Sequence, residues 1–278
     1  MVNRLRRVET FARAGYAARG VVYTLLGYFA LKTLDAKSPT DVLAKINDMQ
    51  LGSILLVLVA LGLAAYGLYR LYSVALNLNG EKDELLGYAK RIGGAVSGFA
   101  HLLLAFVATK AALGSGPQQT NGQEQQTGEA ASQLIAIPGG QIMLIIIGVG
   151  LLFAAFQEGK KAYTGDFMRL LDAGAPPLTE YVGRAGYAAR ALVFTIIGWK
   201  IIEAALADDP ENVGGVGLAL RSLQENQTLF IIVAAGLLLF GVFSLLMARY
   251  RKIRDEDVIN RLKSETREKV AQVKTRNQ

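Results

Sequence analysis

A seven-residue sequence, RAGYAAR, occurs twice in this chain, at residues 13–19 and again at residues 184–190. Each copy leads directly into an apolar run. Self-similarity at a fixed separation is typical of folds built from repeated units, because each copy encodes one supersecondary unit that packs against its neighbours. The chain is therefore expected to consist of repeats.

The repeat extends beyond these seven residues, and a weaker third copy lies between the other two. In the middle copy Gly93 matches Gly15, Ser97 replaces the arginine found at Arg19 and Arg190, and His101 replaces an aromatic residue. The second half of each copy repeats as well. The matching residues are Gly62, Tyr66 and Gly67 in the first copy, Gly150, Ala154 and Ala155 in the middle copy, and Gly236, Phe240 and Gly241 in the last copy. The alignments predict repeat 1 at 1–78, repeat 2 at 79–164, repeat 3 at 165–250 and a charged tail at 251–278.

Six apolar runs of about twenty residues indicate a membrane protein, since roughly twenty apolar residues in a helix cross the ~30 Å hydrocarbon core of a bilayer. The composition agrees, because 52% of the residues are hydrophobic and only 19% are charged, whereas a soluble domain carries more charge. The alternative is six buried helices of a soluble protein. The predicted spans, two per repeat, are 17–34, 51–75, 92–113, 139–158, 185–206 and 228–249. The expected fold is thus an all-α polytopic membrane protein.

The basic residues predict the orientation. Lys and Arg are numerous before the first span, in the connections after the second and fourth spans, and in the tail. They are fewer in the connections after the first, third and fifth spans. This alternation follows the positive-inside rule for six spans with both termini in the cytoplasm. It also explains the net charge of +7 through orientation and contact with anionic lipids, so no nucleic-acid partner is expected.

Each repeat crosses the membrane twice, so all three repeats share one orientation. Repeats of this kind can be related by rotation about the membrane normal, which predicts a pseudo-three-fold ring of six helices. Residues 114–133, in the outer loop of repeat 2, are rich in Gly, Gln, Ser and Thr, and such a composition predicts disorder. A short amphipathic helix is expected in each outer loop, ending near Met49, Ile137 and Leu223.

The residues that open each repeat resemble those of an uncharacterised bacterial membrane family, domain of unknown function twelve-oh-six. Its tandem two-helix units carry an AR-x-GY-x-AR-like opening, found here at 12–19 and 183–190, and a G-x-x-x-YG-x-Y-like second helix, found at 62–69. The resemblance covers the chain to about residue 251. It implies a multi-pass protein of the bacterial inner (cytoplasmic) membrane and supplies no activity.

Two glutamate–arginine pairs have the spacing of a helical ion pair. Glu9 precedes Arg13 by four residues, and Glu180 precedes Arg184 by four. An acidic residue four positions before a basic one is the favourable orientation, worth a few tenths of a kcal/mol when exposed. These pairs are predicted to be structural.

Arg19 and Arg190 are less usual, because they lie about 9 Å deeper into the spans than the first arginine of each repeat, at ~1.5 Å per residue. An arginine within a span faces a partner, a cavity or lipid phosphate, or extends back to the headgroups. Guanidinium binds phosphate or carboxylate in a bidentate manner. One hypothesis is therefore an anion or lipid-headgroup site at Arg19, Arg190, Tyr16 and Tyr187.

The other hypothesis for these arginines is an ion pair inside the bundle, with Glu158 as the candidate partner. Glu158 lies at the cytoplasmic end of the fourth span, where the other repeats have Arg70 and Ser244.

No catalytic or metal site is expected. The chain has no cysteine and one histidine, so thiolate sites and bis-histidine haem ligation are excluded, and no metal or cofactor is predicted. His101 is expected to pack with one hydrogen bond, with a proton relay as the alternative.

Three functions stay open. The preferred one is a non-catalytic scaffold or anionic-lipid-binding protein, whose partners are membrane lipids and, for a scaffold, another protein or a second copy. The alternatives are a transporter or channel for a small solute along the symmetry axis, and an enzyme acting on lipids.

Overall fold

The computed structural model describes residues 2–77, 84–114, 131–207, 209 and 213–251, with side chains from residue 12 onward. These residues form helices and no β-strand; one isolated antiparallel bridge joins Leu171 to Arg251. The tail beyond residue 251 and most of the outer loop predicted to be disordered lie outside the described residues. At the end of that loop, residues 131–135 are helical.

The described residues include six long helices and several short ones. The long helices are α1 (Val2–Thr33), α3 (Gly52–Ala75), α4 (Leu85–Ala112), α6 (Gly140–Thr164), α7 (Leu178–Ala207) and α9 (Gln227–Tyr250). The short ones are α2 (Pro39–Asn47), the 3-10 helix η1 (Asp166–Leu170) and α8 (Val216–Ser222). Each predicted repeat thus contributes two long helices: α1 and α3, α4 and α6, or α7 and α9.

Four described helices, α3, α4, α6 and α9, are long and apolar enough to cross a membrane. The predicted spans 17–34 and 185–206 fall within α1 and α7, which are 32 and 30 residues long. Charged residues such as Arg19 and Arg190 lower the mean hydropathy of these two helices below that of the other four.

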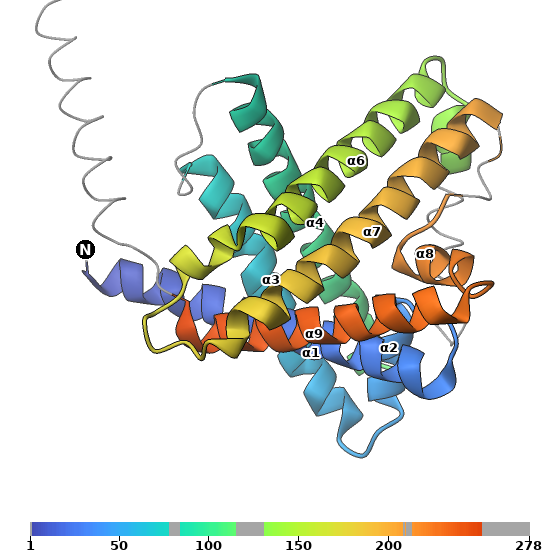
Figure 1. Cartoon of the computed structure of the whole chain (residues 1–278). Helices are drawn as coiled ribbons and strands as arrows, with labels where there is room; N and C mark the ends of the chain where they lie inside the picture. The colour runs from blue at the N-terminus through green and yellow to red at the C-terminus, as the bar shows by residue number, and fades with distance from the viewer. Residues whose placement is uncertain (1, 78–83, 115–130, 208, 210–212, 252–278) are drawn as a thin grey trace, which may run out of the picture.

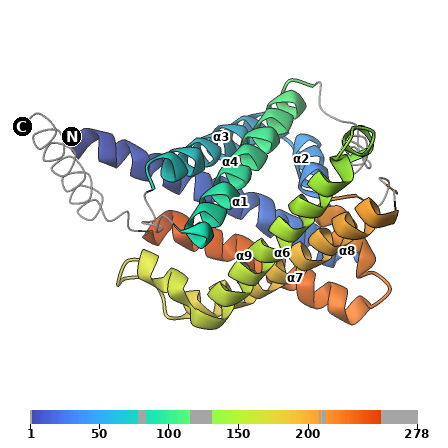
Figure 2. The ribbon, with the colours of Figure 1, turned by 90° about the horizontal axis from the view of Figure 1, so that it is seen from above.

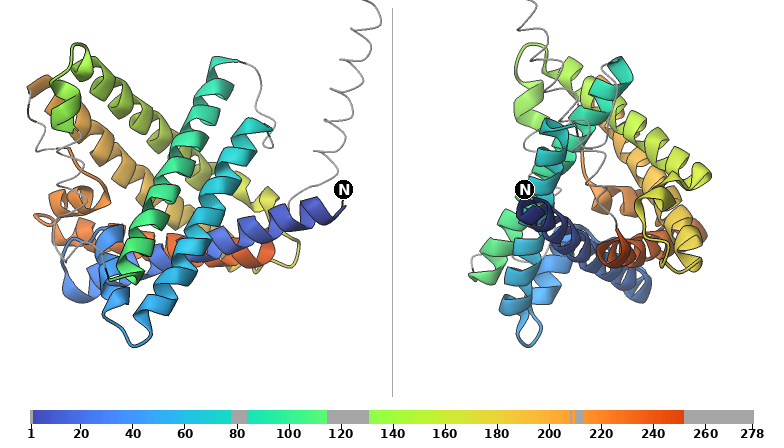
Figure 3. Two further views of the ribbon diagram at one scale, coloured as in Figure 1. Left: turned by 180° about the vertical axis from the view of Figure 1, so that it is seen from behind. Right: turned by 90° about the vertical axis from the view of Figure 1, so that its left-hand side faces the viewer.

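The long helices pack in a continuous series. α4 packs on α3, α3 on α1, α1 on α9, α9 on α7 and α7 on α6. In Figure 1 the α6–α7 and α1–α9 pairs are each seen side by side, and Figure 2 shows α1 and α9 between the α3–α4 pair and the α6–α7 pair. The two outer pairs diverge from α1 and α9 in Figure 3. The series is open, because α4 and α6 at its two ends are not packed on each other.

Glycines let the helices of repeats 1 and 3 approach closely. A Cβ built on Gly15 of α1 would stand 2.3 Å from the Cβ of Tyr66 on α3. The matching Gly186 of α7 would bring a Cβ to 2.6 Å from the Cα of Phe240 on α9. Small residues at such crossings bring helix backbones together and increase van der Waals packing.

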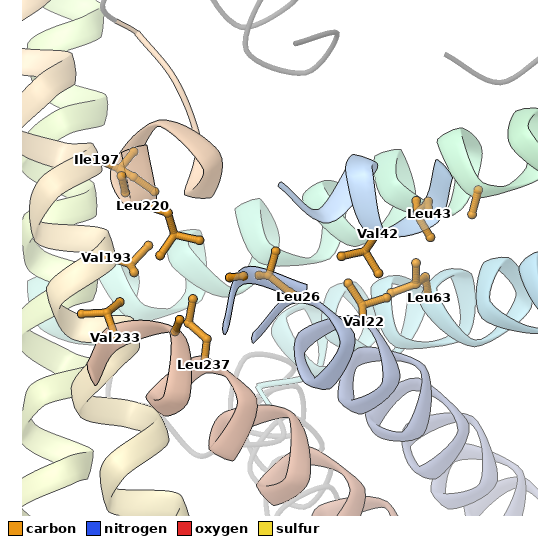
Figure 4. Close-up of a cluster of buried hydrophobic side chains, with 14 of the residues drawn as sticks. Val22, Leu26, Val42, Leu43, Leu63, Val193, Ile197, Leu220, Val233 and Leu237 are labelled. Atoms are coloured by element: carbon orange, nitrogen blue, oxygen red, sulfur yellow. The ribbon is translucent and has the colours of Figure 1, made fainter. Parts of the chain in front are cut away.

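The buried side chains form two clusters that follow one another along the helices. The larger, shown in part in Figure 4, includes Leu26, Leu63, Val193 and Leu237 and is joined by α2 and α8 through residues such as Leu43 and Leu220. The smaller cluster lies toward the other end of α1, α3, α7 and α9, and is rich in aromatic rings: Tyr16, Tyr66, Tyr69, Phe167, Tyr187, Phe240 and Phe243.

The start of α2 is fixed by a capping box. The Ser38 hydroxyl accepts a hydrogen bond from the backbone N–H of Asp41, and the Asp41 carboxylate accepts one from the backbone N–H of Ser38. Pro39 occupies the first helical turn, where its missing N–H costs nothing. The α2 helix is therefore held in place against α1, α3 and α4.

Candidate functional site

Arg19 is buried at the centre of the smaller cluster, with 8% of its surface exposed. Its Nε donates to the hydroxyl of Ser244 on α9 over 3.2 Å, and its Nη1 donates to the hydroxyl of Tyr66 on α3 over 2.8 Å. The guanidinium therefore joins three helices through neutral partners. Its side chain is buried among the helices.

Aromatic rings surround the same guanidinium. The Cζ atom of Arg19 lies 4.8 Å from the ring centroid of Tyr16, 5.1 Å from that of Tyr66 and 4.8 Å from that of Phe240. These are cation–π distances, and such contacts stabilise a desolvated cation. Within the described side chains, no carboxylate forms an ion pair with Arg19, so the groups in direct contact with its guanidinium are hydroxyls and rings; Glu158 acts on it from farther away.

Arg190 occupies the matching position on α7 but has a charged partner. Its Nη1 lies 3.0 Å from Oε2 of Glu158 on α6, and the two side chains are only 16% and 9% exposed. The other oxygen of Glu158 accepts a hydrogen bond from Lys161 over 2.6 Å. Glu158 thus contacts Arg190 and not Arg19, and one carboxylate is shared by two cations.

Phe240 connects the two arginines. Its ring centroid lies 4.8 Å from Cζ of Arg19 and 4.4 Å from Cζ of Arg190. Phe240 itself is fully buried, so both guanidinium groups pack on one buried ring.

Two further arginines join the cluster. Arg251, directly after α9, donates to the hydroxyls of Tyr16 and Tyr69. Arg70 on α3 faces α4, where its Nη2 stands 3.8 Å from a Cβ built on Gly94. Arg19 thus contacts Tyr66 directly, Arg251 contacts Tyr16 and Tyr69, and Arg70 lies one helical turn from Tyr66 on α3.

Arg70 is the repeat equivalent of Ser244, and Ser97 is the equivalent of Arg19. Where α1 packs on α9, the first helix of a repeat carries the arginine, Arg19, and the second helix carries the serine, Ser244. Where α4 packs on α3, the first helix carries the serine, Ser97, and the second carries the arginine, Arg70. Each interface between repeats therefore contributes one arginine: Arg19, Arg70 or Arg190.

The cluster has more buried donors than partners. The Nε atoms of Arg70, Arg190 and Arg251 are buried with no hydrogen-bond partner. A buried donor left without a partner costs about 1–3 kcal/mol, more for a charged group. Among the described side chains, this group of four arginines and Lys161 has one carboxylate in contact, that of Glu158, which pairs with Arg190 and Lys161. A bound anion would satisfy such donors, and guanidinium binds phosphate or carboxylate particularly well.

The two predicted tyrosines are buried in the same cluster but play different parts. Tyr16 contacts Arg19 and Arg251. Tyr187 packs on Phe240, with ring centroids 5.6 Å apart, and has Lys161 over its ring at 5.3 Å.

Of the two predicted ion pairs of the repeat openings, the structure describes the one in repeat 3. Arg184 pairs with Glu180, with Nη2 2.7 Å from Oε1, and it also donates to the carbonyl oxygen of Ala162. Arg13 is exposed, and the side chain of Glu9 lies outside the described residues.

His101 packs beside the cluster. Its Nδ1 lies 2.7 Å from the carbonyl oxygen of Ser97, and its ring centroid lies 4.6 Å from that of Tyr66. Among the described residues, no group of three His, Asp or Glu side chains could hold a metal ion.

The sequence did not single out Arg70, Tyr66, Tyr69, Phe240 and Arg251 as site residues. The repeat alignment carried part of the signal, because it placed Arg70 and Ser244 at the position of Glu158. Which helix would face which could not be read from that alignment alone.

The comparisons with known proteins agree with the repeats. A protein-family profile described as Domain of Unknown Function (DUF1206) matches three times, at residues 14–76, 92–165 and 185–251. The chain is similar to the uncharacterized protein YxxB of Bacillus subtilis (strain 168), with 29% identity over 256 residues that cover 88% of this chain and 91% of that protein. No solved structure matches the chain.

Proposed function

Because the chain belongs to the family described as Domain of Unknown Function (DUF1206), we propose its function from the geometry of the site. It is a non-catalytic membrane protein that binds an anionic group, such as the phosphate of a lipid headgroup, in the buried cluster around Arg19 and Arg190. The anionic lipid is the proposed partner, and no nucleic acid and no cofactor take part.

The proposal includes a six-span protein of the bacterial inner membrane with both termini in the cytoplasm. Two features support it: α1 and α7 are long enough to cross a bilayer, and the basic residues alternate between connections. The packing order α4–α3–α1–α9–α7–α6 supports the proposal of a pseudo-three-fold arrangement, in which the ring would be open between α4 and α6. This orientation puts the arginine cluster near the cytoplasmic side.

The observation that carries anion binding is the environment of Arg19. Its guanidinium is buried, yet its hydrogen-bond partners are the neutral hydroxyls of Ser244 and Tyr66. Burying a charge with no counter-charge in contact is costly, and Arg70 and Arg251 add further positive charge to the same cluster. An anion bound here would lower that cost.

A transporter or channel is the second candidate, since the arginines face the interior of the helix series rather than lipid. The large apolar cluster that includes Leu26, Val193 and Leu237 lies farther along the same helices. A solute passing from end to end would have to part this cluster, so the geometry favours binding.

The experiment that tests the proposal is native mass spectrometry of protein incubated with phosphatidylglycerol vesicles. We expect the wild type to retain the lipid and Arg19→Ala/Arg190→Ala to lose it. Arg13→Ala, an exposed charge on the same helix, serves as the control and should retain it. Arg19→Lys preserves the charge without the bidentate fork and should retain less lipid than the wild type.

Retention of phosphatidylglycerol equal to that of a zwitterionic lipid, or unchanged in the double variant, would contradict anion binding. The remaining function would then be a scaffold for a protein partner or a second copy of the chain. If the double variant fails to fold, Arg19→Lys alone decides.

A further inference from the structure

The series of helices is broken at one place, between α4 and α6. Both belong to repeat 2, and in repeats 1 and 3 the two long helices of the same repeat do pack together, α1 on α3 and α7 on α9. Repeat 2 therefore lacks a contact that the other two repeats make. We call the gap the α4–α6 seam, defined by Gly93 on α4 and Gly150 on α6, whose equivalents pack closely in repeats 1 and 3.

The glycines on the first helix of each repeat show the difference. Gly15 and Gly186 have backbone atoms of the partner helix within 3 Å of a built Cβ, whereas the matching Gly93 has nothing within 4 Å. The glycines on the second helices behave in the same way. A Cβ on Gly62 or Gly236 would meet an alanine at 2.5 Å or 2.4 Å, whereas the matching Gly150 again has nothing within 4 Å.

The seam leads to the arginine cluster. Ser97 and His101 lie on the side of α4 turned toward the cluster, as the contact between His101 and Tyr66 shows. Arg70 faces the same helix near Gly94. The Nε atoms of Arg70 on α3, which packs on α4, and of Arg190 on α7, which packs on α6, are buried without a hydrogen-bond partner.

The helices that border the seam are charged at one end and apolar along the rest. Lys90 and Arg91 lie near the start of α4, and Lys160 and Lys161 lie near the end of α6. Beyond them large apolar side chains are exposed on both helices: Val96, Phe99, Leu103, Ile142, Ile146 and Phe156. A basic end followed by apolar surface matches the chemistry of an anionic phospholipid, whose headgroup is charged and whose chains are apolar.

We propose that the α4–α6 seam is a lateral entrance through which an anionic phospholipid reaches the cluster from the bilayer. Its phosphate binds Arg70 and Arg190, and its acyl chains lie along α4 and α6. This inference rests on the proposed function, because it needs the cluster to bind an anion. It adds the direction of entry and assigns the ligand to the membrane rather than to the solvent.

The test closes the seam with a disulfide, which is convenient because the chain has no cysteine. Val96→Cys/Gly150→Cys joins the residues of repeat 2 that match Ala18 and Gly62, which touch in repeat 1. A disulfide requires Cβ atoms about 3.5–4.5 Å apart, so α4 and α6 must move together when it forms. The matched control is the single variant Val96→Cys, which undergoes the same oxidation but cannot join α4 to α6 within one chain.

The measurement is the uptake of deuterated phosphatidylglycerol from vesicles, followed by native mass spectrometry. We expect oxidation of Val96→Cys/Gly150→Cys to abolish uptake and reduction to restore it, while oxidation of the control leaves uptake unchanged. Gly150→Trp fills the seam without a disulfide and should also block uptake, so the test stands even where the disulfide does not form.

Uptake at the wild-type rate in both the oxidised pair and Gly150→Trp would overturn the lateral entrance. If Arg19→Ala/Arg190→Ala still lost the lipid, the proposed function would stand without the lateral entrance. A wild type that retains no lipid would remove the proposed function itself. A disulfide joining two chains would assign the seam to a dimer interface and equally overturn the proposal.

Discussion

Equivalent glycines in the three repeats should respond in opposite ways to the same substitution. A Cβ on Gly15 would stand 2.3 Å from the Cβ and 2.6 Å from the Cα of Tyr66. Because one of these atoms is backbone, rotation of the Tyr66 side chain cannot relieve the overlap. At Gly93 a Cβ has nothing within 4 Å.

The magnitudes follow from two opposing effects. Overpacking at a tight contact costs typically about 1–3 kcal/mol, whereas replacing a glycine by alanine within a helix stabilises it by roughly 0.5–1 kcal/mol. Gly15→Ala should therefore lower the free energy of unfolding by up to about 2 kcal/mol. Gly93→Ala should raise it by up to about 1 kcal/mol, since only the helical gain applies.

The assay is thermal unfolding of both variants in one detergent, followed by far-UV circular dichroism. At roughly 2–4 °C per kcal/mol for a chain of this size, the two midpoints should lie on opposite sides of the wild-type value. Gly186→Ala, whose Cβ would meet the backbone of Phe240 at 2.6 Å, should follow Gly15→Ala. If Gly93→Ala destabilised the protein as much as Gly15→Ala, α4 and α6 would have to be packed and the reasoning about the seam would be refuted.

Two further predictions concern charged groups. Glu158→Gln removes the counter-charge of the buried Arg190 and should destabilise the protein by about 3–5 kcal/mol. The control is Glu203→Gln, which should change the midpoint of thermal unfolding little, because the Glu203 side chain is 51% exposed. Equal midpoints for the two variants would show that the buried pair carries no net stability. The hydrogen bond from Lys37 lowers the pKa of Asp35 below its ordinary 3.8, so its small stabilisation is present above that value and is lost as the pH falls through the lowered pKa. Asp35→Asn should therefore make the midpoint less sensitive to pH on the acid side, and an unchanged pH profile would argue against this contribution.

The repeats made much of the fold predictable. The glycines and arginines of the repeat openings marked α1 and α7 as equivalent helices, and the apolar runs marked the others. The expected short helices of the outer loops appear as α2, residues 131–135 and α8. These features are local, because they depend on spacing within one repeat.

What could not be predicted depends on contacts between repeats. Glu158 could equally have paired with Arg19, because the alignment gives each arginine the same surroundings; the packing of α6 on α7 decides for Arg190. Arg251 looked like part of a charged tail, yet it contacts Tyr16 across 235 residues of sequence. The open seam had no signal at all, since Gly93 and Gly150 match the glycines that pack closely in repeats 1 and 3.

The pairing of α1 with α9 has a consequence for biosynthesis. A chain is made from its N-terminus, so the first long helix emerges long before the last one, against which it finally packs. Ser244, a hydrogen-bond partner of Arg19, is 225 residues away in sequence. Until α9 is made, Arg19 is a charged side chain without its final surroundings, and nascent chains that stop before α9 are the ones that quality-control proteases should recognise.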